Sequence, residues 1–289
     1  NTANTLNIDV TTSGTLTDSG IITAGTLDVF TVNEVITLDS ANVVGTFIAN
    51  NDSGTGANVL FTRNGGNVAI GTSDIGNNTF DINVTTSGSL IDSGVITANL
   101  VDISTVNGSV TFDSANQFGN ITATTGSGQI DIDNDIALDI TAAGITTTGN
   151  VSLDLSGGAG ALTQSGIISC DVLSVSTNSQ NVTLTLANTV NTFLSDTIVG
   201  VAGGNVSFVN DGQNLALGIN NLNTANTLNI DVTTSGTLTD SGVITVGTLD
   251  ILTVNGLVDL NEANQFGNLT ATTGSGQIDI DNDIALDIT

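Results

Sequence analysis

The stretch SGTLTDSGIIT occupies residues 13–23 and returns along the chain at a fixed interval. It recurs as SGSLIDSGVIT at residues 87–97, a step of 74 in residue number (87 minus 13), and as SGTLTDSGVIT at residues 235–245, a further step of 148 (235 minus 87). Since 148 is twice 74, a copy is expected between them, and ALTQSGIIS at residues 161–169 is that copy in altered form. The chain therefore contains four sequence repeats, of which the third is diverged and the fourth incomplete, at residues 1–74, 75–148, 149–222 and 223–289.

A second landmark lies at a constant distance from the first. Each repeat contains an Ala-Asn pair that is followed within a few positions by Phe. The residue number of the alanine exceeds that of the serine in the preceding Ser-Gly pair by 22 in all four repeats, as in 41 minus 19 for the first. The four pairs are Ala41-Asn42, Ala115-Asn116, Ala187-Asn188 and Ala263-Asn264. Spacing is thus kept where residue identity is not, as stacked structural repeats require.

Short stretches within each repeat alternate apolar and polar residues, as in LNIDV at residues 6–10 and QIDIDNDIALDI at residues 129–140. A period of two is typical of strands with one buried face, and the Gly and Asn residues between them favour turns. The chain has 34 Gly, no Pro and 39% hydrophobic residues. It therefore has enough apolar material for a core, and no residue that would remove a backbone donor from a stacked strand. The sequence predicts an all-β fold, a parallel β-helix (β-solenoid) built as one continuous solenoid from about four 74-residue repeats. We expect roughly 12 to 15 turns of about 18 to 25 residues, stacked about 4.8 Å apart.

Neither end of the chain has the features of a cap. Asn1 corresponds to Asn223 and Thr289 to Thr141, and both partners lie inside repeats. An uncapped turn leaves an open strand edge that can pair with another chain. We therefore expect either a longer parent chain or self-association, end to end or laterally, into filaments.

The charge balance is one-sided, with 28 acidic residues against one basic residue and a net charge of −27. Arg63 is the sole cation, so nothing is available to neutralise phosphates, and binding to nucleic acid or to an anionic membrane surface is excluded. No apolar run is long enough to span a membrane, and we expect no membrane insertion. Cys170 stands alone, so no internal disulfide can form, and a buried inert thiol is expected.

The residue inventory argues against catalysis. The chain has no His, Lys or Tyr, so the Ser and Thr hydroxyls have no ordinary base to activate them. Pairs of Asp are the remaining option, because glycoside hydrolysis needs two suitably spaced carboxylates. We expect a protein that is not an enzyme, with no required cofactor.

The densest acidic cluster is a run of three alternate aspartates that occurs twice. Its members are Asp131, Asp133 and Asp135, repeated as Asp279, Asp281 and Asp283. Like charges on neighbouring turns repel, and Ca²⁺, which takes six to eight oxygen ligands, would relieve that repulsion. These six residues are the candidate calcium ligands. The alternative interpretation is a solvated outer strand face, because many other aspartates also lie between apolar strand residues.

Three segments resemble the repeats of large bacterial exoproteins of the filamentous-haemagglutinin type, which belong to the two-partner secretion family. They are LTQSGIIS at residues 162–169, LTDSGVITVGTL at residues 238–249 and SANQFGNITA at residues 114–123. The resemblance implies a right-handed parallel β-helix at the cell surface, acting in adhesion, aggregation or a biofilm matrix. The Asn-Pro motifs of the family's secretion domain are missing from this Pro-free chain, and autotransporter passengers are alternative relatives.

Taken together, these features predict a secreted, extracellular, non-enzymatic structural fibre or adhesin stalk segment. Such a rod would self-associate or space an adhesive tip from the cell, with a surface polysaccharide or a receptor on a host or neighbouring cell as a possible partner. The alternatives are a calcium-ordered surface-layer or biofilm-matrix component and, second, a polysaccharide-active β-helix enzyme. The enzyme would have a groove with two carboxylates.

Overall fold

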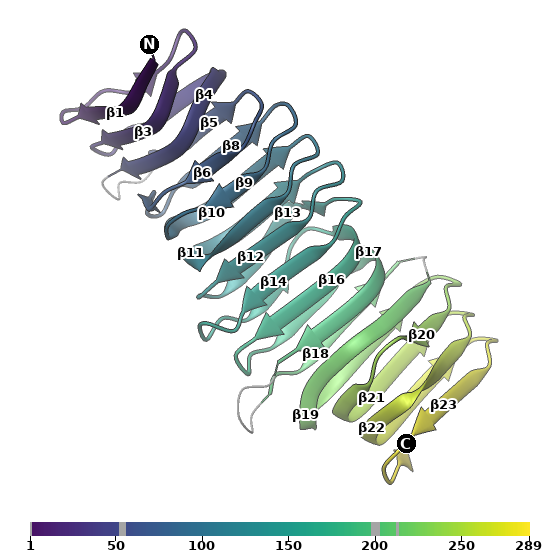
Figure 1. The fold of residues 1–289 in the computed structure, drawn as a ribbon. Helices are drawn as coiled ribbons and strands as arrows, with labels where there is room; N and C mark the ends of the chain where they lie inside the picture. The colour runs from purple at the N-terminus through teal and green to yellow at the C-terminus, as the bar shows by residue number, and fades with distance from the viewer. Residues whose placement is uncertain (1, 52–55, 198–202, 212–213) are drawn as a thin grey trace. The chain divides into compact units, whose positions relative to one another are not determined.

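The computed structural model describes residues 2–51, 56–197, 203–211 and 214–289, and these residues form strands and turns without a helix (Figure 1). The chain divides into two compact units. Unit one consists of Asn1–Leu138 and Thr146–Gly149, and unit two of Asp139–Ile145 and Asn150–Thr289. Strand β13 (Leu138–Thr146) contributes to both.

Unit one contains twelve further strands among its described residues. They are β1 (Thr2–Val10), β2 (Leu16–Thr17), β3 (Thr23–Thr31), β4 (Ile36–Asn51), β5 (Val59–Arg63), β6 (Val68–Ile70), β7 (Ser73–Asp74), β8 (Thr79–Val84), β9 (Leu90–Asp92), β10 (Ile96–Thr105), β11 (Val110–Thr124) and β12 (Ile130–Asn134).

Unit two contains eleven further strands over its own described residues. They are β14 (Val151–Leu155), β15 (Leu162–Gln164), β16 (Ile168–Thr177), β17 (Val182–Asp196), β18 (Val206–Asn210), β19 (Leu215–Val232), β20 (Leu238–Asp240), β21 (Ile244–Thr253), β22 (Val258–Thr273), β23 (Ile278–Asn282) and β24 (Asp287–Ile288).

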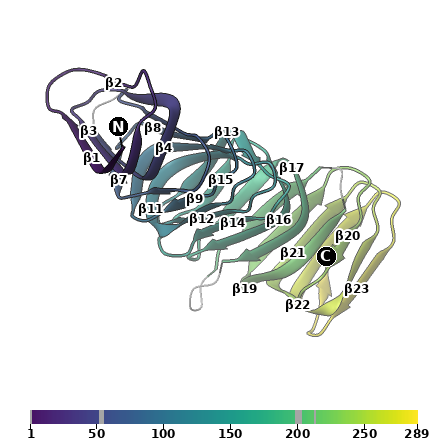
Figure 2. The same ribbon diagram turned by 45° about the horizontal axis from the view of Figure 1, so that its top comes forward.

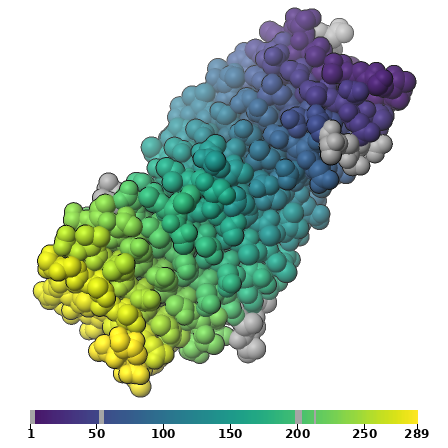
Figure 3. All heavy atoms as spheres, turned by 180° about the vertical axis from the view of Figure 1, so that it is seen from behind, coloured from purple at the N-terminus to yellow at the C-terminus, as the bar shows by residue number. Residues whose placement is uncertain are grey.

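Both units are parallel β-solenoids. Each strand pairs in parallel with the strand one turn later, so that Leu27 lies beside Phe47, twenty positions on, and Leu228 beside Leu249. Strands β9, β11 and β12 lie side by side in this way (Figure 1 and Figure 2). Within each unit the colours of the space-filling view change in chain order, because each turn packs on the next (Figure 3). The predicted fold is confirmed, with about 13 turns of roughly 21 residues over the described chain.

The repeating unit of the structure is therefore one turn of the solenoid. The four repeats of about 74 residues are repeats of the sequence only. The two counts differ because each sequence repeat spans about three and a half turns of the solenoid. Because of the half turn, equivalent residues of successive repeats alternate between two of the strand columns of each unit. In unit one, Leu16 lies in a column that consists of β2, the start of β4, then β5, β8 and β10, and the end of β11.

Leu90, the equivalent of Leu16 in the second repeat, lies in the other column of unit one. That column consists of β1, β3, the end of β4, β6, β9, the start of β11 and β12. Unit two has the same alternation, with Leu162 in β15 pairing with β17 and Leu238 in β20 pairing with β19 and β22. Two successive copies of one sequence thus present their side chains on different faces of the same solenoid.

The inward residues of the strands form the core. Eight of the nine Phe are fully buried, and Phe30 is the exception. Phe47 stacks on Phe61 with ring centroids 4.1 Å apart, and Phe193 stacks on Phe208 in the same way at 4.3 Å. Stacked rings add about 0.5–1.5 kcal/mol to the free energy gained by burying their area.

Each unit has an edge along which glycines of successive turns approach one another closely. A Cβ atom on Gly108 would lie 1.6 Å from the carbonyl oxygen of Gly88, and one on Gly128 would lie 2.0 Å from that of Gly108. In unit two, a Cβ on Gly276 would lie 1.8 Å from the oxygen of Gly256. At these positions the stacking distance leaves no room for any side chain.

The Ala-Asn landmark has a structural cause. Asn116 is fully buried, and its Oδ1 accepts a hydrogen bond from the backbone N–H of Ile96, 20 residues earlier, at 2.8 Å. Its Nδ2 donates to Oδ2 of Asp92 at 2.8 Å. The Asp92 carboxylate also accepts from the backbone N–H groups of Asp113 and Ser114. We call this arrangement the Asp–Asn clamp.

The Asp–Asn clamp recurs in every repeat with the same 24-residue interval. The pairs are Asp18 with Asn42, Asp92 with Asn116, Gln164 with Asn188 and Asp240 with Asn264. In the third repeat the amide of Gln164 replaces the carboxylate, and its Oε1 accepts from Asn188 and from the backbone of Leu186. The clamp joins adjacent turns where the ladder shifts register, and this explains the constant spacing.

Candidate functional site

Nine aspartates that lie between apolar strand residues are directed outward, as the alternation predicts. None is buried, whereas flanking residues such as Leu27 and Val29 around Asp28 are fully buried. The nine are Asp9, Asp28, Asp81, Asp102, Asp139, Asp154, Asp231, Asp250 and Asp259. The outer faces of the strands are therefore acidic.

The first set of candidate calcium ligands lies on and after β12. Asp131 and Asp133 are half-buried on the outer face, between the buried Ile130, Ile132 and Asn134. The Cα atoms of alternate residues of a strand are about 6.6 Å apart, so Asp131 and Asp133 are neighbours on this face. Asp135 follows the strand, and its backbone N–H donates to the carbonyl of Asn116.

The second set, on and after β23, is more exposed. Asp279, Asp281 and Asp283 are all exposed, and Asp279 lies in register with Asp259 one turn earlier. Among the residues that the structure describes, no three or more Asp, Glu, Cys or His side chains are grouped so that they could hold a metal ion. The assignment of calcium to the six aspartates stays a prediction.

Asp81 and Asp102 form a carboxylate pair that the sequence pattern alone does not reveal. They lie in register on β8 and β10, and Nδ2 of Asn83 donates to Asp81 at 2.8 Å. Burial, and to a smaller extent the charge of Asp102, raises the pKa of Asp81. Burial alone raises the pKa of Asp102. Knowledge of the turn length would have predicted this pair.

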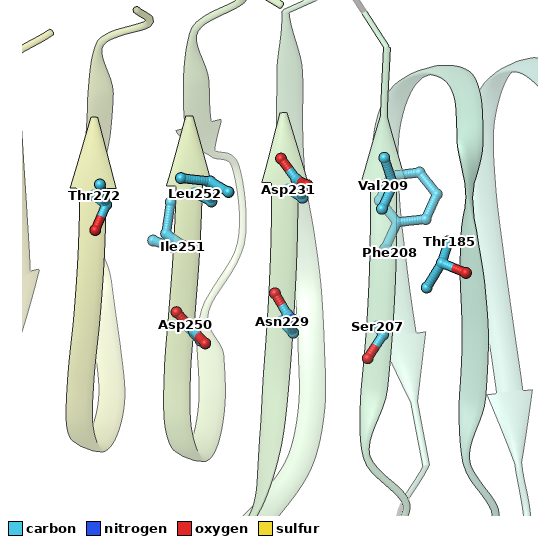
Figure 4. A pocket seen from close by; sticks show the side chains of 10 residues that line it. All are labelled: Thr185, Ser207, Phe208, Val209, Asn229, Asp231, Asp250, Ile251, Leu252 and Thr272. Carbon is cyan, nitrogen blue, oxygen red and sulfur yellow. The ribbon is translucent and has the colours of Figure 1, made fainter. Parts of the chain in front are cut away.

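A groove of about 350 Å³ lies on the outer face of unit two (Figure 4). Its lining comes from β17, β18, β19, β21 and β22. The lining residues are Thr185, Ser207, Phe208, Val209, Asn229, Asp231, Asp250, Ile251, Leu252 and Thr272.

Strand register explains how the groove is formed. One row of outward side chains runs Ser207, Asn229 and Asp250 along adjacent turns, and a second runs Val209, Asp231, Leu252 and Thr272. The two rows flank the groove, and its floor includes the buried Phe208 and Ile251.

Asp231 and Asp250 face the groove from opposite rows and adjacent strands (Figure 4). From strand and residue spacings, their Cα atoms are roughly 8 Å apart. Burial raises the pKa of Asp231. The lining contains no cation, so the groove offers hydrogen-bond acceptors, hydroxyls and an apolar surface.

The thiol of Cys170 is inert in this structure. Cys170 is buried in β16, and burial, with a contribution from the charge of Asp171, raises its pKa to about 12. The thiol is therefore protonated near neutral pH and neither attacks nor binds a metal readily.

Comparison of the chain with protein-family models, with curated proteins and with solved structures found no match. Over the described residues, the structure has no helix with the length and apolar character needed to cross a membrane. The resemblance to filamentous-haemagglutinin-type repeats, and the right-handed sense it implies, stay predictions.

Proposed function

We propose that the chain is a non-enzymatic structural segment of an extracellular fibre or adhesin stalk. The observation that supports this most is the recurrence of the Asp–Asn clamp with one 24-residue interval in all four repeats. The same device joins successive turns wherever the sequence repeats. A scaffold of this kind can be lengthened by adding copies, without a new fold for each addition.

The outer surface supports the same proposal. A net charge of −27 keeps a repetitive β protein soluble and discourages uncontrolled lateral pairing of its faces. The absence of His, Lys and Tyr from the sequence is also what a spacer tolerates and most enzymes do not.

Lengthening the chain tests the spacer role. One and two further copies of residues 75–148 would be inserted after residue 148, at the boundary between the second and third repeats. We expect folded proteins whose particles, imaged by electron microscopy, grow by roughly 17 Å per copy, because three and a half turns add that length. Extended chains that misfold, or that fold without a regular gain in length, would exclude the spacer role.

Localisation needs a separate experiment. Antibodies raised against the chain would be applied, with gold label, to intact source cells and to sections of the same cells. We expect label on the outside of intact cells or in the surrounding matrix. Label found in sections only, within the cell interior, would exclude the extracellular role.

A calcium-ordered surface-layer or matrix component is the second candidate. It is favoured by two pairs of aspartates in register on adjacent turns, Asp81 with Asp102 and Asp259 with Asp279. Thermal melting with calcium and with a chelator separates the candidates. A midpoint that rises by several degrees with calcium supports the second, and an unchanged midpoint removes it.

A further inference from the structure

We propose that the groove of unit two binds a segment of a neutral oligosaccharide. This assignment concerns the outer face of β17, β18, β19, β21 and β22 and does not depend on the fibre proposal. The groove crosses five adjacent strands, and four strand spacings amount to roughly 19 Å. A long, shallow site of this kind suits an elongated ligand.

The hydrogen-bonding groups of the groove define the ligand chemistry. The hydroxyls of Thr185, Ser207 and Thr272 and the amide of Asn229 can both donate and accept, whereas the carboxylates only accept. A complementary ligand must donate opposite the carboxylates and both donate and accept elsewhere. Neighbouring hydroxyl groups of a sugar ring do both.

Charge excludes one class of saccharide. Asp231 and Asp250 both face the groove, and no lining residue is cationic. Uronates, sulfates and phosphates would therefore meet repulsion without compensation. The ligand is an uncharged sugar.

The apolar part of the lining favours a sugar over a small cation. Leu252 is 46% exposed, and Val209 lies in the same row. This surface can pack against the C–H face of a sugar ring. An ammonium ion would pair with the carboxylates but could not accept hydrogen bonds from the groove hydroxyls.

Repeat one supplies a natural comparison, because its sequence LNIDV matches that around Asp231. There the position of the lining residue Leu252 is taken by Phe30, which is directed outward. A side chain of this size at position 252 would fill part of the groove. The natural residue of repeat one therefore provides a conservative way to reduce the space in the groove.

The experiment measures binding of neutral hexasaccharides of glucose, mannose, galactose and N-acetylglucosamine to the full chain, by calorimetry and saturation-transfer NMR. The groove-filling variant carries Leu252→Phe, the residue of repeat one. Asp231→Asn and Asp250→Asn test the carboxylates, and Asp9→Asn is the matched control. Thermal melting verifies that each variant is folded.

We expect wild type and D9N to bind at least one hexasaccharide equally, and the groove-filling variant to lose binding. Each of D231N and D250N should weaken binding about tenfold or more, because a hydrogen bond to a charged group is lost. The proposal is overturned if no neutral hexasaccharide binds or if the groove-filling variant binds like wild type. Preference for spermidine or trilysine would also overturn it. Hydrolysis of the bound sugar would replace it with the enzymatic alternative.

Discussion

Replacing Asn116 by alanine tests the most specific feature of the core. The side chain is fully buried and makes three hydrogen bonds, to the N–H of Ile96 at 2.8 Å, to Asp92 at 2.8 Å and to the carbonyl of Asp133 at 3.2 Å. Alanine removes all three hydrogen bonds and leaves the N–H of Ile96, the carboxylate of Asp92 and the carbonyl of Asp133 without this partner.

The expected loss of stability follows from the groups left behind. A buried N–H without a partner costs about 1–3 kcal/mol, and a hydrogen bond to a charged group contributes about 1.5–3 kcal/mol. Asn116→Ala should therefore lower the free energy of unfolding by about 3–5 kcal/mol. For a chain of this size that corresponds to a fall of roughly 10 °C in the melting midpoint.

The assay is thermal and urea unfolding followed by circular dichroism, with hydrogen exchange read at the amide of Ile96. Asn120→Ala is the matched control, because Asn120 lies on the same strand and makes its hydrogen bonds to Asn99 at the surface. We expect the control to change stability by no more than about 0.5 kcal/mol. Equal stability of N116A and N120A, with Ile96 still protected, would refute the role of the clamp.

The third repeat predicts that glutamine can replace the aspartate of the Asp–Asn clamp without a large loss of stability. Gln164 occupies the place of Asp92 and still accepts hydrogen bonds from its Asn and from the backbone. Asp92→Gln should therefore retain most of the stability that Asp92→Leu loses. If the two variants melt together, the hydrogen bonds of this position do not stabilise the fold.

Three further predictions concern other parts of the chain. Gly108→Ala should destabilise the fold by about 3 kcal/mol, since overpacking adds to the loss of hydrogen bonds at the turn. Gly20→Ala is the control and should melt like wild type, because a Cβ atom at Gly20 meets nothing within 4 Å. Folding raises the pKa values of Asp81 and Asp102 above 3.8, so the folded state binds their protons more readily than the unfolded chain does. The free energy of unfolding should therefore rise as pH falls from 7 through the raised values, and the gain should be complete below the pKa of the unfolded chain. The D81N/D102N variant, melted across the same pH range, should show a smaller rise. Cys170 should react with a thiol reagent at neutral pH only after unfolding, and fast labelling of the native chain would contradict its burial.

The sequence was sufficient for the fold class but not for its internal geometry. Alternation around residues such as Leu27 and Phe47 predicts which side chains are buried, and both are in the core. The interval of 74 residues can be recognised from sequence identity between repeats. The length of one turn cannot, because successive turns have similar backbone structures but few identical residues. The alternation of Leu16 and Leu90 between columns follows from the turn length alone.

The candidate sites required register as well as sequence. The Ala-Asn pair was evident, but its meaning depends on Asp92 lying next to Asn116 in space, 24 residues away. The groove depends on side-chain sizes in adjacent turns, which no single strand reveals. The aspartates of the DIDND runs were grouped from their closeness in sequence, and their assignment as calcium ligands stays a prediction.

The stacking of one turn on the next can be measured directly with pairs of spin labels in unit one, on a Cys170→Ala background. Register pairs place the following outward residues one turn apart in series: Asp131, Thr111, Ile91, Ala69, Thr46, Thr26 and Thr5. With one label fixed at Asp131, partners at Thr46, Thr26 and Thr5 should give distances of roughly 19, 24 and 29 Å, an increase of about 4.8 Å per turn. Distances that do not grow by a constant step along this series would contradict the solenoid and every conclusion drawn from its register.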